Sequence, residues 1–140
     1  MTNLDDDHAT AILGLLDANP LLTGKVYDGA LPTPRPSLPY VVVYLHIEQL
    51  PGEPGNALDG VSAQVTLRAT CHCVGGDAAA ARAVGFQVKT ALKDVTPTIA
   101  DRSCGQIGQE STAPPVKDET TGVLVMDQVA VYKLITHPAG

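Results

Sequence analysis

The chain has 140 residues, of which 44 % are hydrophobic and 17 % charged, the composition of one folded soluble domain and not of a disordered segment. Nine basic against fifteen acidic residues give a net charge of −6, which argues against a protein that grips nucleic acid, but not against one that surrounds DNA without holding it. No apolar run approaches the length that spans a bilayer, and the first residues are acidic where an export signal is basic, so we expect no membrane partner and synthesis in a cytoplasm.

The first part of the chain predicts a helix, a short strand and a proline-rich loop. Asp5-Asp6-Asp7 provides an N-cap and acidic first-turn residues, which favour the positive end of a helix dipole. Asn19-Pro20 ends this helix near Ala18. A strand follows over residues 24–27, and four prolines within residues 30–39 indicate an extended excursion that joins no sheet.

Tyr40–Glu48 is the clearest strand of the sequence. Its odd-numbered residues, from Val41 to Ile47, form an aliphatic core face. The opposite face carries Tyr40, Val42, Tyr44 and His46. Because this second face is unusually apolar for one in contact with solvent, we expect a helix or a neighbouring subunit to cover it.

The middle of the chain predicts a loop, a strand and a second helix. Residues 51–60 contain five Gly and Pro residues and form a flexible loop that assembly could order. Residues 61–74 alternate between apolar and polar side chains, the pattern of a strand with one buried face. After the break at Gly75-Gly76, Asp77 caps a helix that runs to about Lys93.

Phe86, the only phenylalanine of the chain, falls nearly opposite the aliphatic stripe of this second helix, beside Arg82 and Lys89. Aromatic residues with basic neighbours are common at protein interfaces, although a single exposed apolar residue needs no explanation. We select as interface candidates the residues of this helix face and of the second face of the Tyr40–Glu48 strand. They are Phe86, Arg82, Lys89, Tyr40, Tyr44 and His46.

The last part of the chain predicts a short strand near residues 105–111, a polar turn over 117–122 and a long strand over 123–136. Both faces of the long strand are apolar, which is typical of a strand at the centre of a sheet. The elements predict a single α+β domain (1–140). We expect a mixed, mainly antiparallel sheet of about four or five strands packed with two helices, in the order α-β-β-β-α-β-β.

Cys71-His72-Cys73 suggests a metal site, with Cys104 as the fourth ligand. In a strand, however, successive side chains point to opposite faces, so His72 leaves the sheet on the side opposite to the two thiols. The alternation also places Cys71 and Cys73 where small buried residues belong. We therefore expect a structural role for these cysteines and no bound metal.

Catalytic signatures are missing from the sequence. The four histidines, His8, His46, His72 and His137, are scattered, and no GxSxG motif of a nucleophile elbow occurs. The Gly75-Gly76-Asp77 turn lacks the pattern of a phosphate-binding loop. We expect neither enzymatic activity nor a cofactor.

Several segments follow one another in a distinctive order. A strand ending in Val26-Tyr27-Asp28-Gly29 leads through the proline-rich loop to Leu38-Pro39-Tyr40-Val41-Val42-Val43. The run Val65-Thr66-Leu67-Arg68-Ala69-Thr70-Cys71 enters a small-residue turn and a helix, and Gly122-Val123-Leu124-Val125-Met126 begins the closing strand. In this order and spacing, over most of its length, the chain resembles the small tail-terminator, or tail-completion, proteins of long-tailed bacteriophages.

This resemblance implies a structural virion protein at the tail–neck junction, made in the host cytoplasm. Such proteins form a homo-oligomeric ring, usually a hexamer, that caps the tail tube. The expected partners are the major tail tube protein, whose polymerisation the ring stops, and a head-neck connector or stopper protein. The family has no catalytic residues to carry over.

The resemblance also implies that DNA passes through the lumen of the ring without specific binding. Six chains of charge −6 bring together about −36 formal charges. Acidic residues that face the lumen would repel DNA from the wall, so that it slides instead of sticking.

Three alternatives remain open from the residues. The chain departs from the simplest pattern of the family in two places: the loop over 29–39 is denser in proline, and residues 128–140 are more apolar. The first alternative is therefore a different head–tail connector (neck) protein. The second is a small thiol- or metal-dependent enzyme that uses Cys71, His72, Cys73 and Cys104. The third is a monomeric ligand-binding module with a pocket beneath the 29–39 loop.

Overall fold

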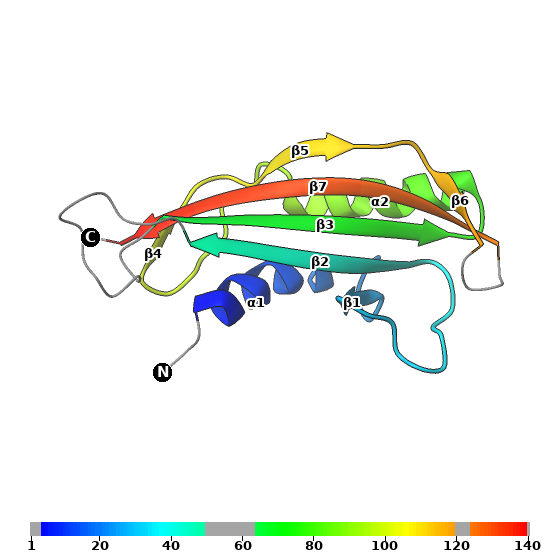
Figure 1. Ribbon diagram of the computed structural model, residues 1–140, viewed down its shortest axis with the longest axis horizontal. Helices are drawn as coiled ribbons and strands as arrows, with labels where there is room; N and C mark the ends of the chain where they lie inside the picture. Colours follow the sequence, from blue (N-terminus) through cyan, green and yellow to red (C-terminus); the bar gives the residue numbers. More distant parts are fainter. Residues whose placement is uncertain (1–3, 50–63, 120–123, 140) are drawn as a thin grey trace.

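The computed structural model describes residues 4–49, 64–119 and 124–139 (Figure 1). In chain order the elements are α1 (Leu4–Asp17), β1 (Val26–Asp28), β2 (Tyr40–Gln49), β3 (Val65–Gly75), α2 (Ala78–Leu92), β4 (Arg102–Cys104), β5 (Gly108–Thr112), β6 (Val116–Asp118) and β7 (Val125–Pro138). The predicted loop over 51–60, the predicted strand start at Val61 and the part of the predicted turn beyond Glu119 lie outside the described residues.

The strands form one mixed, mainly antiparallel sheet, as predicted. They lie in the order β1-β2-β3-β7-β4, and β5 and β6 also pair with β7. β1 runs parallel to β2, whereas the other pairings are antiparallel. β7 is therefore central, as predicted for the last long strand: β3 lies along one of its edges, and β4, β5 and β6 follow one another along the other.

The segment between α2 and β7 contains more strand than the sequence predicts. The pattern predicts one short strand near 105–111 and a turn over 117–122, whereas the structure has β4, β5 and β6. Because Val116–Asp118 pairs with Val125–Asp127, Lys117 lies in a strand and not in a turn. The physical reason is the length of β7, whose fourteen residues offer backbone groups that three short segments satisfy in succession.

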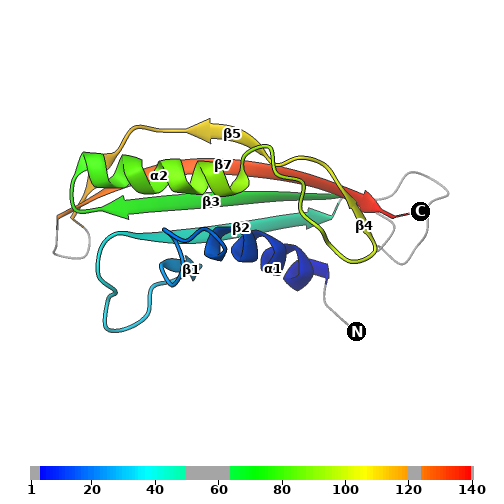
Figure 2. The ribbon, with the colours of Figure 1, turned by 180° about the vertical axis from the view of Figure 1, so that it is seen from behind.

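Both helices pack on the same face of the sheet (Figure 1, Figure 2), and the main core lies between the two layers. The alternation predicted for the second and third strands is confirmed, because their odd-numbered residues face the helices. The core contains Val41, Val43, Leu67, Ala69, Cys71, Cys73, Ala130, Tyr132 and Leu134 from the strands, and Ile12, Leu16, Val84, Val88 and Leu92 from the helices. No helix in the described part of the chain is long and apolar enough to cross a membrane.

The start of α2 is set by Asp77, as predicted. The Asp77 side chain accepts a hydrogen bond from the Ala80 N–H at 2.7 Å, which satisfies one of the free donors of the first turn. At Gly75, a Cβ atom would lie 2.5 Å from the backbone nitrogen of Ala81. The close passage of strand and helix therefore requires this glycine.

Tyr40 belongs to a second, smaller cluster on the face of the sheet that the helices leave open. It is only 3 % exposed, and Tyr27 meets it edge-on, with 6.3 Å between the ring centroids. The cluster contains Tyr40, Val42, Val74 and Val125, packed with Tyr27 and Leu31. This corrects, at Tyr40, the prediction that a helix or a neighbouring subunit covers this face, because Tyr27 of β1 and Leu31 of the proline-rich loop pack there.

Three polar side chains meet in the interior near the end of β7. Nε2 of His8 lies 2.8 Å from Oγ1 of Thr136, and Nδ1 of His8 donates to the Leu4 carbonyl at 2.8 Å. Arg102 donates to Thr136 Oγ1 through Nε and Nη2 and to the Thr136 carbonyl through Nη2. Since all three residues are buried, this network ties α1, β4 and β7 together through one hydroxyl.

We expect Thr136→Val to lower the free energy of unfolding by about 1–3 kcal/mol, because it removes the buried hydroxyl that His8 and Arg102 bind, at almost unchanged volume. Urea denaturation measures the change. Thr112→Val, on the exposed strand β5, serves as the control and should stay within about 0.5 kcal/mol of the native protein. Equal stability of the two variants would show that the network is not stabilising.

Candidate subunit interface

The outer face of α2 carries an exposed aromatic ring between basic side chains. Phe86 is 63 % exposed, and Arg82 and Lys89, one turn away on either side, are exposed as well. Gly85 lets the helix approach β7 closely, because a Cβ atom there would lie 2.6 Å from Gln128 Oε1. We call Arg82, Phe86 and Lys89 the aromatic-basic face. The predicted position of Phe86 opposite the core is confirmed.

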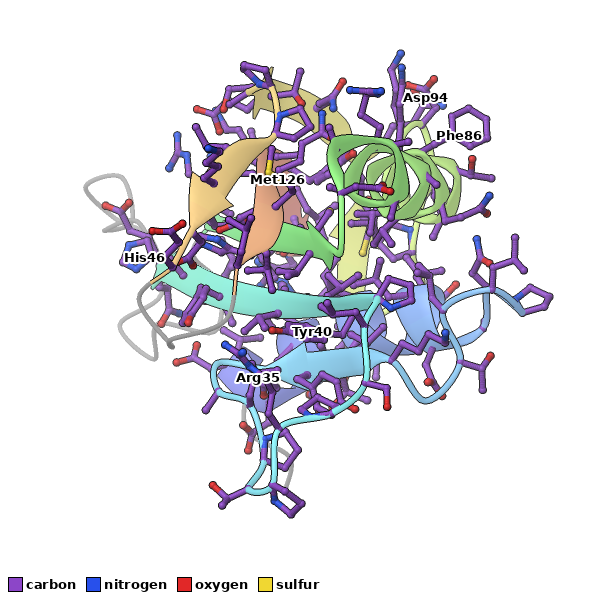
Figure 3. All side chains as sticks on the ribbon, turned by 90° about the vertical axis from the view of Figure 1, so that its right-hand side faces the viewer. Arg35, Tyr40, His46, Phe86, Asp94 and Met126 are labelled. Carbon is purple, nitrogen blue, oxygen red and sulfur yellow. The ribbon has the colours of Figure 1, made fainter. Side chains whose placement is uncertain are left out.

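His46 lies on the other side of the sheet from Phe86 (Figure 3). Tyr44, two residues earlier on β2, shares the face of His46. Tyr44 is 48 % exposed and meets His72 edge-on, with 5.3 Å between the ring centroids. Nδ1 of His72 in turn lies 2.8 Å from Oδ2 of Asp127. The structure therefore divides the predicted interface residues into two separate surfaces and removes Tyr40 from both.

Among the described residues, no strand pairs with the outer edge of β2 beyond Val43. β1 pairs with Val41–Val43, where the Val41 N–H donates to the Lys25 carbonyl and the Val43 carbonyl accepts from Gly29. Because backbone groups alternate between the two edges of a strand, those of Leu45 and Ile47 point to this same outer edge. Such an edge is able to accept a strand from another chain.

A hollow that sequence reasoning missed lies between α1 and β1. Its volume is about 370 Å³, and its lining residues are Thr10, Leu13, Gly14, Asp17, Val26 and Asp28. We call it the α1–β1 hollow. A Cβ atom at Gly14 would meet nothing within 4 Å, so this glycine leaves the hollow open. A glycine within a predicted helix was its only signal in the sequence, and the contribution of β1 required the fold.

A second hollow, of about 220 Å³, lies where the sequence suggested a ligand pocket, at the proline-rich loop. It is lined by Leu31, Arg35, Tyr40, Val42, Tyr44, His72, Val74, Asp118, Val125 and Asp127. Oδ1 of Asp127 is buried there and has no hydrogen-bond partner among the described residues. The volume is below the roughly 300–1,000 Å³ of pockets that enclose small-molecule ligands. This hollow therefore gives little support to the ligand-binding alternative.

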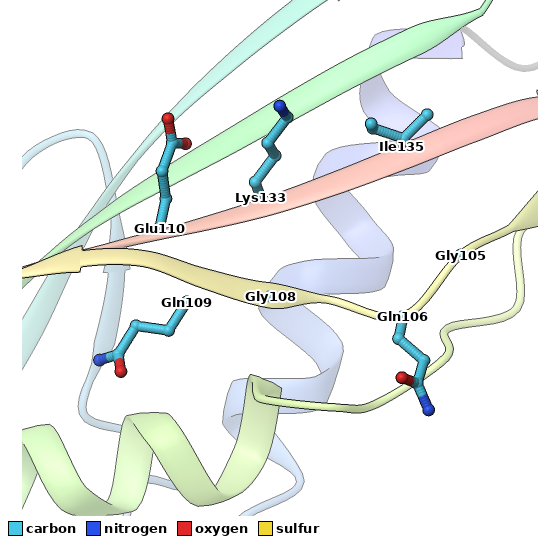
Figure 4. A pocket seen from close by; sticks show the side chains of 7 residues that line it. All are labelled: Gly105, Gln106, Gly108, Gln109, Glu110, Lys133 and Ile135. Atoms are coloured by element: carbon cyan, nitrogen blue, oxygen red, sulfur yellow. The ribbon is translucent and has the colours of Figure 1, made fainter.

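A third hollow, of about 420 Å³, lies along β5 and β7 (Figure 4). It is lined by Gly105, Gln106, Gly108, Gln109, Glu110, Lys133 and Ile135. Its carboxylate, that of Glu110, forms an ion pair with Arg68 at 3.0 Å. These residues include no nucleophile held by a base, which is the arrangement that covalent catalysis requires.

The cysteines have the environment of core residues. Cys71 and Cys73 are buried between the sheet and the helices, whereas His72 points to the opposite face and pairs with Asp127. Burial raises the pKa of the Cys71 thiol to about 12. Burial, together with Cys71 and Asp127, raises the pKa of Cys73 far above its usual range. Both thiols are therefore protonated at neutral pH and unsuited to act as nucleophiles.

At pH 8 we expect an aromatic disulfide reagent to modify half-buried Cys104 before Cys71 and Cys73, although burial raises the pKa of Cys104 too. The reason is that the two core thiols are both protonated and shielded. Peptide mass spectrometry identifies the modified residue, and urea-unfolded protein, in which all three thiols react, is the control. Early modification of Cys71 would instead revive the thiol-enzyme alternative.

Comparisons with known proteins show a shared fold. No protein-family model matches the chain, and no curated protein matches it. Among solved structures, the fold is similar to that of a chain from the virion of a native gene transfer agent particle, with a TM-score of 0.68 and 17 % sequence identity. The match covers 91 % of this chain and 92 % of the other, so the likeness extends over most of both chains.

Proposed function

We propose that the chain is a structural virion protein: a ring-forming subunit that caps the tail tube, stops its polymerisation and joins the tail to the head or neck. The observation that carries this proposal is the fold shared over nine-tenths of both chains with a component of a virion. The order of sequence motifs supports it independently, because it resembles that of tail-terminator proteins.

The exposed surfaces of the subunit suit a ring. A ring repeats one contact between two different surfaces of the same chain. The aromatic-basic face on α2 and the edge of β2 beyond Val43 lie on different parts of the molecule. The aromatic-basic face lies outside the core, whereas Leu45 and Ile47 of the β2 edge pack partly against it. In the described part of the chain nothing covers Phe86 and no strand pairs with the β2 edge beyond Val43, and a ring offers repeated contacts in which to bury such surfaces.

In this proposal the ring binds the major tail tube protein on one side and a connector or stopper protein on the other. DNA passes through the lumen, and the net charge of −6 per subunit limits its attraction to the wall. The protein performs no chemistry and needs no cofactor. The protonated core thiols agree with this assignment.

Light scattering across a dilution series tests the proposal. We expect the mass of six subunits, or a monomer that assembles into a ring when tail tubes are added. A monomer that is indifferent to tubes would contradict the proposal. A ring that binds the connector but not the tubes would favour the neck-protein alternative instead.

We expect Phe86→Asp to abolish assembly of the oligomeric ring while leaving the subunit folded, because the Phe86 side chain lies in solvent and outside the core. Light scattering reports assembly, and circular dichroism reports folding. Val116→Asp, which places the same charge on an equally exposed apolar position of β6, is the matched control and should still assemble. A Phe86→Asp variant that fails to fold would mean that the side chain packs inside the subunit.

A further inference from the structure

We propose that the aromatic-basic face of one copy docks into the α1–β1 hollow of the next copy. Phe86 enters the hollow, and Arg82 and Lys89 lie against Asp17 and Asp28 at its rim. The proposal rests on the ring-forming function proposed above, and it identifies the two surfaces that make the repeated contact.

The volume and the lining of the hollow can accommodate an aromatic side chain. Its volume of about 370 Å³ corresponds to roughly a dozen waters at ~30 Å³ each. Leu13 and Val26 supply apolar surface, and Gly14 leaves the space above the helix free of side chain. Phe86 is the largest exposed apolar side chain on α2. Burying this ring against apolar side chains removes both surfaces from water.

The charges of the two surfaces are complementary. The charged residues of α2 are Arg82 and Lys89, both basic, whereas those of α1 are all aspartates. In a chain of net charge −6, the aromatic-basic face is therefore a local basic surface, and the α1–β1 hollow is an acidic one. Asp17 is held in position, because its Oδ1 accepts the Gly24 N–H at 3.1 Å. This complementarity favours a second copy of the chain as the occupant.

The positions of the two surfaces require a head-to-tail contact. The aromatic-basic face lies on α2, beside β5 and β7. The hollow lies at the opposite edge of the sheet, where α1 meets β1; both helices are on the same face of the sheet (Figure 1, Figure 2). Two different patches that bind each other form a ring when the rotation closes. Asn19 Nδ2 donates to the Gln87 carbonyl and to Gln87 Oε1, which links the end of α1 to α2. The offset between the two surfaces is therefore fixed within the subunit.

The first test fills the hollow. Gly14→Leu should raise the concentration at which the ring dissociates by at least about tenfold, because its side chain occupies the space that Phe86 needs. Gly14→Ala, which adds only a methyl group at the same helical position, should stay within about threefold of the native protein. Since a Cβ atom at this position meets nothing within 4 Å and the hollow has space beyond it, both variants should fold. Equal dissociation of the two variants would overturn the docking contact.

The second test exchanges the charges. One double variant reverses the basic pair (Arg82→Glu with Lys89→Glu), and the other reverses the acidic pair (Asp17→Lys with Asp28→Lys). Each double variant should lose the oligomeric ring. The chain that carries all four changes should regain it. Lys117→Glu on β6 is the control for a single charge reversal. Circular dichroism checks that the acidic-pair variant folds, because Asp17 also accepts a hydrogen bond from the Gly24 N–H. If that variant does not fold, Asp28→Lys alone replaces it. Absence of rescue would contradict the pairing of these two surfaces.

These experiments separate the two proposals. A native protein that forms no ring, with or without tubes, overturns the ring-forming function and the contact together. A native ring that withstands both Phe86→Asp and Gly14→Leu overturns the contact alone. A ring that requires Phe86 but tolerates Gly14→Leu also overturns it, and would place Phe86 against another surface, such as the edge of β2.

Discussion

The structure depends on the pairing of β7. This strand pairs with β3 over eleven residues and with β4, β5 and β6 on its other edge, so it joins the two halves of the chain in one sheet. Thr136 near its end also holds His8 and Arg102. Because β7 gathers residues that are distant in sequence, the sheet becomes rigid enough to present α1 and α2 in fixed positions on one face.

A sheet covered by helices on one face leaves the rest of its surface for contacts. The proline-rich loop buries one end of the open face around Tyr40, while Tyr44 and the aromatic-basic face remain exposed. No described strand pairs with the outer edge of β2 beyond Val43. The charges of the two helices are segregated, with aspartates on α1 and basic residues on α2. A subunit with different and complementary surfaces is suited to repeat one contact around an axis, which is the property a ring requires.

Much of the fold could be predicted from the sequence because its signals are local. The alternation through Cys71 and Cys73, the cap at Asp77 and the outward position of Phe86 each depend on a few neighbouring residues, and the structure confirms all three. Three features depended on distant segments and could not be predicted. Tyr40 is covered by a loop of its own chain, the segment after α2 becomes three strands only beside β7, and the α1–β1 hollow needs two elements that meet only in the fold.

The central claim is that this protein ends the growth of a tail tube, and the length of tubes assembled in vitro tests it most directly. Electron microscopy would compare tubes polymerised from the cognate major tail protein with and without the purified ring. The account predicts that added ring shortens the tubes in proportion to its concentration and appears at one end of each tube. Tubes that grow to the same lengths in both samples, with no density at their ends, would contradict it.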